Sequence, residues 1–219
     1  MKISFDQESK LCKALLKAQG MNDADAELLG PAVTHSDFTG VYSHGLSRFA
    51  NYLKRFANGS MNANANIRAI MDKGSTLAYD CDNGSGIIAI NRIYDELLPR
   101  AREHGIVIAT GNKASNIGCG NYYGWRAAKD NVIGIFVANT ITCVAPFGGA
   151  EGLLGTNPII IAAPSGERYP LIMDISTSVT AFARYRPPRA RAPPYPRVGQ
   201  TTQMADPPPM QSWPPRSSR

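Results

Sequence analysis

The sequence predicts an α/β fold in which an N-terminal helical segment is followed by a mixed α/β region. Helical patterns fill residues 1–60, and short apolar runs then alternate with helical patterns. A Gly-x-Gly-x-x-Gly motif between a strand and a helix is missing, so a Rossmann fold is not predicted. Because the apolar runs lack strict alternation, we expect sheets that are covered on both faces.

The helical segment is expected to contain three helices. Residues 5–19 carry apolar positions at helical spacing and stop at Gly20. Asn22 is the expected cap of a second helix. Ser43 is the expected cap of a third helix over residues 43–57, which Asn58 and Gly59 end.

The remaining elements are predicted from alternating apolar runs and turn residues. The runs at 105–110 and 132–139 read as buried strands. The other predicted strands are 66–71, 75–80, 157–164 and 169–176, and the predicted helices are 86–104 and 121–130.

Composition narrows the class of protein. No apolar run reaches the roughly 18 residues of a membrane span, and the N-terminus is polar within its first residues. The four cysteines are scattered and form no C-x-x-C pair, so we read them as reduced thiols and expect no metal site. These observations predict a cytoplasmic protein without membrane association.

The basic charge is confined to the end of the chain. Residues 184–219 contain seven arginines, one acid (Asp206) and ten of the sixteen prolines, so the net charge of +6 arises there entirely. Such a segment cannot bury enough apolar surface to fold, and we expect it to be disordered. A tail that binds nucleic acid or a polyproline-recognising domain is the alternative. We expect no nucleic-acid partner, because charge runs are usually solvated.

His44 and Arg48 are the candidate catalytic residues. With Ser43 as the cap, His44 would lie in the first helical turn, and Arg48 would lie one turn further on the same face. A histidine of near-neutral pKa can exchange a proton with an alkoxide, and an arginine can bind a carboxylate with two parallel bonds. The alternative is a capped surface helix with a solvent-facing arginine. His35 and His104 are expected to be structural.

Three loops follow predicted strands, where ligands of α/β sheets bind. They cover residues 111–125, 139–158 and 174–178. Their small and polar residues could approach a ligand or could only form turns and caps, and the residues alone do not decide between these readings.

Six short motifs in order resemble the type-2 malate/L-lactate dehydrogenase family, whose members include ureidoglycolate dehydrogenase and 2,3-diketo-L-gulonate reductase. The resemblance covers about residues 5–183. The motifs are S-H-G-L-S-R (43–48), Y-G-W-R-A-A (123–128), A-N-T (138–140), P-F-G-G (146–149), G-T-N-P (155–158) and M-D-I-S-T-S (173–178).

The resemblance implies an NAD(P)-dependent oxidoreductase, usually dimeric, with a non-Rossmann nucleotide-binding fold. The substrate would be a small 2-hydroxy or 2-oxo acid, with His44 as the acid/base and Arg48 as the carboxylate clamp. Residues 1–60 would be the substrate-side segment and 61–183 the NAD(P)-binding region. The implied NAD or NADP contacts are Ser115, Thr140, Asp174, Ile175 and Ser176.

Two departures from the family pattern matter. Asn116 stands where many relatives carry a second active-site histidine, and asparagine can hydrogen-bond a substrate but cannot exchange a proton. From Arg184 the sequence matches nothing in the family, which suggests a frameshift or truncation and an α/β region that is incomplete at its C-terminus. The alternative function is therefore an inactive family member that only associates with a full-length subunit.

Overall fold

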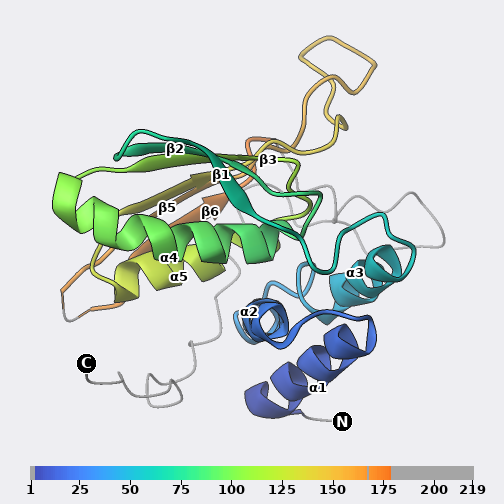
Figure 1. Cartoon of the computed structure of the whole chain (residues 1–219). Coiled ribbons are helices and arrows are strands. Elements are labelled where there is room, and N and C mark those ends of the chain that lie inside the picture. Colours follow the sequence, from blue (N-terminus) through green and yellow to red (C-terminus); the bar gives the residue numbers. More distant parts are fainter. Residues whose placement is uncertain (1–2, 167, 179–219) are drawn as a thin grey trace. The chain divides into compact units, whose positions relative to one another are not determined.

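Three helices open the chain in the computed structural model, which describes residues 3–166 and 168–178 (Figure 1). They are α1 (Phe5–Ala18), α2 (Asp23–Phe38) and α3 (Leu46–Ala57). All described residues lie within one compact unit, residues 1–185. The tail of residues 184–219, which we expect to be disordered, lies outside the described residues, and the domain boundaries at residues 60 and 183 stay predictions.

Local capping explains where the first two helices begin. The Ser4 hydroxyl accepts the Gln7 amide at 3.2 Å, and the Gln7 side chain accepts the Ser4 amide at 3.0 Å. This reciprocal pair satisfies two amides that would otherwise lack partners. The Asn22 side chain accepts the Asp25 amide at 2.9 Å, which confirms the predicted cap of α2.

The helices bury a shared apolar core. It is formed from α1, α2, α3 and the first turn of α4 (Gly86–His104). Its largest fully buried apolar side chains are Leu16, Leu29, Val33, Met61 and Ile87.

Two three-stranded sheets follow. The first has the order β1-β2-β3, with an antiparallel β1–β2 pair and a parallel β2–β3 pair, whose crossover is α4. The second has the order β4-β5-β6 and is antiparallel throughout. The strands are β1 (Arg68–Asp72), β2 (Thr76–Asp80), β3 (Ile108–Asn112), β4 (Gly134–Val137), β5 (Ile159–Ala163) and β6 (Leu171–Ile175).

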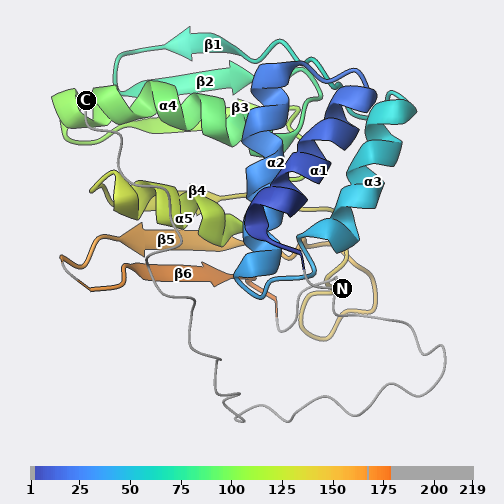
Figure 2. The ribbon, with the colours of Figure 1, turned by 90° about the horizontal axis from the view of Figure 1, so that it is seen from below.

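One helix packs against one face of each sheet. Helix α4 contributes Ala89, Ile93 and Leu97 to a cluster with β2, and α5 (Gly120–Lys129) lies along β4, β5 and β6 (Figure 2). The approach of α5 is close because it presents glycines there. A methyl group at Gly120 would collide with Ile160, and one at Gly124 would collide with Ile172.

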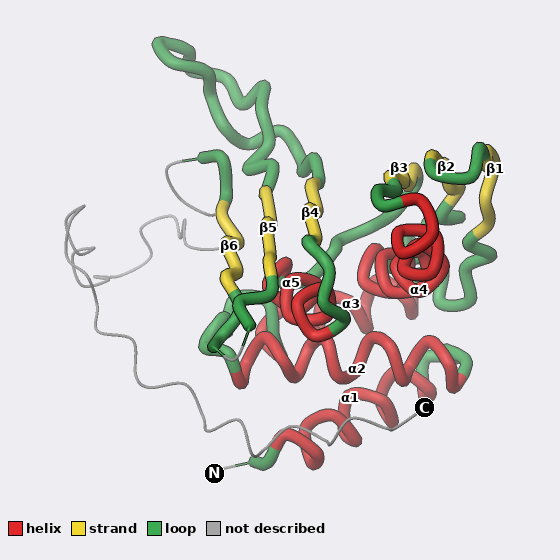
Figure 3. Tube along the Cα trace, turned by 90° about the vertical axis from the view of Figure 1, so that its left-hand side faces the viewer, coloured by secondary structure: helices red, strands yellow, loops and turns green. Residues whose placement is uncertain are grey.

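The opposite faces of the strands are open in the described residues, so the prediction of two covered faces is wrong there. Ile108 is 60% exposed, Ile135 66% and Val137 70%. The runs at 105–110 and 132–139 are therefore not buried strands, although each overlaps a strand. In the run at 105–110, strand β3 begins only at Ile108. The reason is that Gly105, with a φ of 79°, still caps the end of α4. Figure 3 shows the long loop between β4 and β5, which projects beyond the strands.

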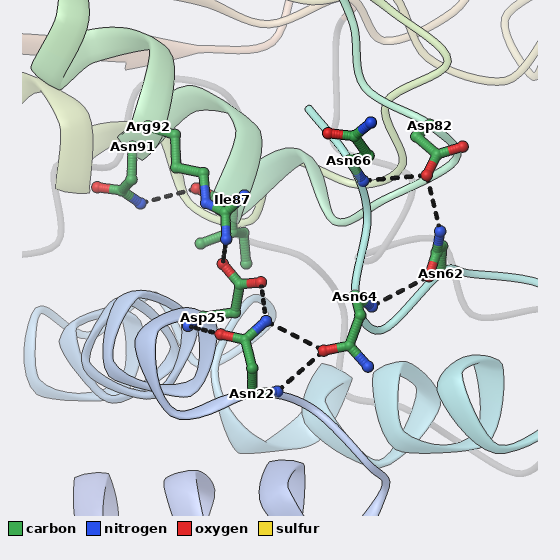
Figure 4. Close-up of polar contacts among 9 residues, drawn as sticks. All are labelled: Asn22, Asp25, Asn62, Asn64, Asn66, Asp82, Ile87, Asn91 and Arg92. Atoms are coloured by element: carbon green, nitrogen blue, oxygen red, sulfur yellow. Dashed lines mark hydrogen bonds and ion pairs between the residues drawn. The ribbon is translucent and has the colours of Figure 1, made fainter. Parts of the chain in front are cut away.

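A polar network ties α2 to α4 and to the loop after α3 (Figure 4). The Asp25 carboxylate accepts Arg92 Nη2 at 2.6 Å and Asn22 Nδ2 at 2.8 Å. Asn64 joins the network because its Oδ1 accepts both the amide and Nδ2 of Asn22 at 3.0 Å. The Asp25 side chain is only 2% exposed, so its charge depends on these partners.

Replacing Asp25 by alanine should lower the free energy of unfolding by about 1–3 kcal/mol, because it leaves Arg92 without its carboxylate acceptor and removes one of the two acceptors of Asn22 Nδ2. Urea denaturation measures the change. Asp23→Ala is the matched control on the same helix, since Asp23 pairs with Lys17 at 84% exposure and should cost under about 1 kcal/mol. Equal losses for the two variants would contradict the assigned role of the network.

Candidate functional site

His44 lies in the turn just before α3. Helix α3 begins at Leu46 and its N-cap is Gly45, so the predicted Ser43 cap is wrong, and His44 is not in the first helical turn. The Ser43 hydroxyl instead lies 2.9 Å from His44 Nδ1. When Ser43 accepts this bond, the ring proton of neutral His44 is on Nδ1, which leaves Nε2 free to accept a proton from a substrate.

The surroundings of His44 favour its neutral form. Burial lowers the pKa of His44 below its ordinary value of 6.5, and the positive charge of Arg48 lowers it further. The carboxylate of Asp174 acts in the opposite direction. The largest cause of the lowered pKa is therefore desolvation. A histidine with this balance can both accept and donate a proton.

Arg48 lies in the first turn of α3 and is half-buried. Its Nε is buried and has no hydrogen-bond partner among the described residues. An unpaired guanidinium nitrogen costs free energy unless a ligand or water meets it. Arg48 is therefore placed near His44 with donor capacity for an anionic ligand.

Asn116 is connected to the neighbourhood of His44 and Arg48 through Tyr52. The Tyr52 hydroxyl donates to Asn116 Oδ1 at 2.7 Å, and the Gly118 amide donates to the same oxygen at 2.8 Å. Burial raises the pKa of Tyr52 to about 12, so the phenol stays protonated. Because Asn116 Oδ1 already accepts two hydrogen bonds, Asn116 has its Nδ2 protons left to donate to a substrate carbonyl. Tyr52 is missing from our predicted site, although its position one helical turn after Arg48 was a usable signal.

Asp174 approaches His44 from β6. Its Oδ2 accepts the Asn121 amide at 2.8 Å and thus satisfies the start of α5. Its Oδ1 would be met by a methyl group at Gly120, which shows how closely it lies against α5. The next residue, Ile175, is 47% exposed.

Cys119 stands beside Asp174 but is not a nucleophile. Its Sγ lies 3.0 Å from Asn121 Oδ1 and 3.8 Å from Asp174 Oδ2. Burial and the Asp174 carboxylate raise the pKa of Cys119 to about 12. The thiol therefore stays protonated, and thiolate chemistry is excluded here.

Thr140 and Ser176 meet through a residue that sequence reasoning missed, Thr156. Thr140 Oγ1 accepts the Thr156 amide at 2.8 Å, and the two hydroxyls lie 3.1 Å apart. The Ser176 hydroxyl donates to the Thr156 carbonyl at 3.1 Å. Thr140 and Thr156 lie near opposite ends of the loop between β4 and β5, and Ser176 follows β6, so only the folded chain groups them.

Ser115 lies where the loop before α5 passes the start of α4. Its amide donates to the Gly84 carbonyl at 2.9 Å, and a methyl group at Gly86 would collide with its carbonyl oxygen. The Ser115 hydroxyl is buried and has no partner among the described residues. An orphaned hydroxyl on a glycine-lined loop suits a polar ligand group.

The predicted residues thus form two groups joined by β6. The first contains His44, Arg48, Asn116 and Asp174, and the second contains Thr140 and Ser176. Within residues 3–166 and 168–178, no three His, Cys, Asp or Glu side chains form a metal-binding cluster. The described helices include none with the length and apolarity to cross a membrane, and all four cysteines are free.

Comparison with known proteins places the chain in a family. The family model described as malate/L-lactate dehydrogenase matches residues 3–198, so the expectation that nothing from Arg184 onwards matches the family is wrong for residues 184–198. The malate dehydrogenase of Pyrococcus horikoshii is 33% identical over 170 residues, which cover 78% of this chain and 47% of that protein. The 2,3-diketo-L-gulonate reductase of Escherichia coli O1:K1 is 30% identical, with 83% of this chain and 54% of that protein covered. The chain spans about half the length of these relatives.

The fold agrees with the sequence comparison. The solved structure of the Pyrococcus horikoshii malate dehydrogenase superposes with a TM-score of 0.80 at 31% identity. The match covers 84% of this chain and 52% of that structure. The family match over most of the chain and the shared fold lead to one conclusion: the chain belongs to the malate/L-lactate dehydrogenase family.

Proposed function

We propose that the protein is an NAD(P)-dependent oxidoreductase that interconverts a small 2-hydroxy acid and the corresponding 2-oxo acid. The observation that carries the proposal is the pairing of His44, a proton carrier kept neutral by burial, with Arg48, whose buried Nε lacks a partner among the described residues. A 2-hydroxy or 2-oxo acid requires both: a proton carrier for its hydroxyl or carbonyl oxygen and a cation for its carboxylate.

The chain's own residues would divide the work. Arg48 holds the substrate carboxylate and orients the neighbouring carbon. His44 gives a proton to the oxygen of that carbon during reduction and takes it back during oxidation, through Nε2. Asn116 donates from Nδ2 and cannot exchange a proton, so proton transfer falls on His44. A bound nicotinamide would supply or accept the hydride.

The residues proposed to hold NAD or NADP are Ser115, Thr140, Asp174, Ile175 and Ser176. The orphaned Ser115 hydroxyl and the Thr140–Thr156–Ser176 cluster fit the hydroxyl and phosphate groups of a dinucleotide. Asp174 also satisfies the start of α5, so its contribution to cofactor binding would come on top of a structural role. We expect a cytoplasmic homodimer with neither a nucleic-acid nor a membrane partner.

The alternative is an inactive family member that only associates with a full-length subunit. The observation that favours it is the open apolar face of the strands, with Ile135 and Val137 at least two-thirds exposed. Surfaces of this kind are usually covered in stable proteins.

One assay separates the two. The purified chain is mixed with NADH or NADPH and a panel of 2-oxo acids that includes oxaloacetate and pyruvate, and cofactor absorbance is followed. Consumption that requires the 2-oxo acid supports the oxidoreductase. No consumption, together with no quenching or enhancement of NADH fluorescence on binding, contradicts it and favours the inactive family member.

A further inference from the structure

The start of α3 lacks a cap of its own. The N-cap residue is Gly45, which has no side chain to accept the amides of the first turn. The missing acceptor comes from another helix, because Oδ2 of Asp37 in α2 accepts the Leu46 amide at 2.6 Å. A carboxylate in this position also meets the positive end of the helix dipole.

Gly45 is required by space rather than by backbone conformation. Its φ of −89° is open to any residue. A methyl group built at Gly45 would overlap the Asp37 carboxylate. The carboxylate therefore occupies the volume where a side chain at the N-cap would begin, directly beside His44.

Glu8 on α1 lies near the Asp37 carboxylate. It is 2% exposed, and its Oε1 has no hydrogen-bond partner among the described residues. Burial raises the pKa of Glu8 to about 7, and the nearby Asp37 carboxylate and a hydrogen bond to it act in the same direction. The other titratable group that faces this pair is the Cys12 thiol, whose pKa is raised to about 12, first by burial and then by Glu8. Neutral Glu8 can donate its proton to Asp37.

The Asp37 contact acts on the segment that carries both candidate catalytic residues. The Gly45 carbonyl accepts the Arg48 amide at 2.9 Å. The position of Gly45 therefore determines where Arg48 lies in the first turn of α3. On the other side, the His44 amide donates to the Val41 carbonyl at 2.9 Å. The groups whose charges act on the His44 ring are Arg48 and Asp174.

We propose that Asp37 is a positioning residue for the His44–Arg48 pair, because its carboxylate replaces the absent cap of α3. The proposal rests on the proposed function only for its effect on catalysis. Without the carboxylate, the first turn of α3 frays, and His44 and Arg48 lose their fixed separation. A shift of about 1 Å in such a pair can cost about a hundredfold in rate.

The first test follows the His44 ring by NMR and needs no activity. The chain has three histidines, and H44A identifies the His44 signals. In D37A, we expect the His44 signals to move and its titration midpoint to rise towards the solvated value of about 6.5. The signals of His104, at the end of α4, should not move and serve as the internal control. D37N, whose amide oxygen can still accept the Leu46 amide, should lie closer to wild type.

Two outcomes overturn the proposal. One is a D37A protein in which His44 titrates as in wild type. The other is a D37N protein that matches D37A, since the hydrogen bond would then not be what positions His44. If D37A does not fold, D37N decides. A Leu46 amide as protected from exchange as in wild type, together with a wild-type His44 midpoint, supports the proposal. A Leu46 amide that exchanges as fast as in a coil, with the His44 midpoint unchanged, contradicts it.

Activity distinguishes this proposal from the proposed function. If H44A loses turnover and D37A loses about 10–100-fold in kcat/KM, both stand. If H44A retains full turnover while the His44 signals still move in D37A, the proposed function fails and the positioning by Asp37 stands. If H44A loses turnover and D37A retains wild-type kcat/KM, the positioning role is wrong.

The pH dependence of stability tests whether buried Glu8 has a raised pKa. Since the folded-state pKa of Glu8 is raised from 4.5 to about 7, its stabilising neutral form is fully present below about pH 4.5 and is lost as the pH rises through about 7. E8Q cannot ionise, so it should be more stable than wild type at about pH 8, and the difference should shrink towards about pH 5. The control is E103Q, an exposed position on α4, which should show no such trend. A pH-independent difference for E8Q would show that burial does not raise the pKa of Glu8.

Discussion

Replacing His44 by alanine should lower kcat for reduction of a 2-oxo acid by about 10²–10⁴-fold, because no neighbouring group can take over the proton. Asn116 cannot exchange one, and Tyr52 keeps its own with a pKa raised to about 12 by burial. Steady-state kinetics of the purified variant measure the loss. His104→Ala is the matched control, since His104 is an exposed histidine at the end of α4.

The pH profile adds a second signature of His44. Reduction needs the protonated ring, so its kcat/KM should fall as the pH rises through the His44 pKa, and oxidation should fall as the pH drops below it. Because burial and Arg48 lower this pKa, the inflection should lie below 6.5. The inflection should be absent from any residual activity of H44A. A variant with unchanged kcat and profile would show that the proton comes from elsewhere.

Replacing Arg48 by alanine should raise KM for a 2-oxo acid by about 10–100-fold, since the charge-assisted bonds to the substrate carboxylate are lost. R48K should recover only part of this affinity, because an ammonium cannot form the two parallel bonds of a guanidinium. Removing the positive charge should also raise the His44 pKa, which moves the inflection of the pH profile upwards.

A substrate pair sharpens the Arg48 test. With pyruvate, wild type and R48A should differ strongly. With methyl pyruvate, which lacks the carboxylate, their kcat/KM values should converge. R55K is the control on the same helix, since Arg55 contacts the Ser60 carbonyl and belongs to neither predicted group. An equal effect of R48A on acid and ester would mean that Arg48 does not bind the carboxylate.

The local signals predicted the helices well and the strands less well. Ser4, Gln7 and Asn22 set the starts of α1 and α2 through contacts within three residues, which a sequence displays directly. Ser43 failed as a cap because Asp37 from another helix supplies the acceptor. The strand burial was wrong because apolar composition says nothing about what covers the second face of a sheet.

The site divides in the same way. The spacing of His44 and Arg48 and their chemistry are properties of the chain, and the family motifs around them are visible in the sequence itself. The contacts of Asn116 with Tyr52, and of Thr140 with Ser176 through Thr156, join segments far apart in sequence. Short-range patterns carry no information about such meetings.

The sequence by itself determined the family, the order of helices and strands, and the residue types able to move a proton and hold a carboxylate. The tertiary structure decided where α3 begins, why the His44 pKa is lowered, and which carboxylates serve structure. The physical reason is the distance along the chain over which each interaction acts. Propensity and capping act over a few residues, whereas burial and charge at His44 depend on Arg48 and on Asp174, which lies 130 positions away along the chain.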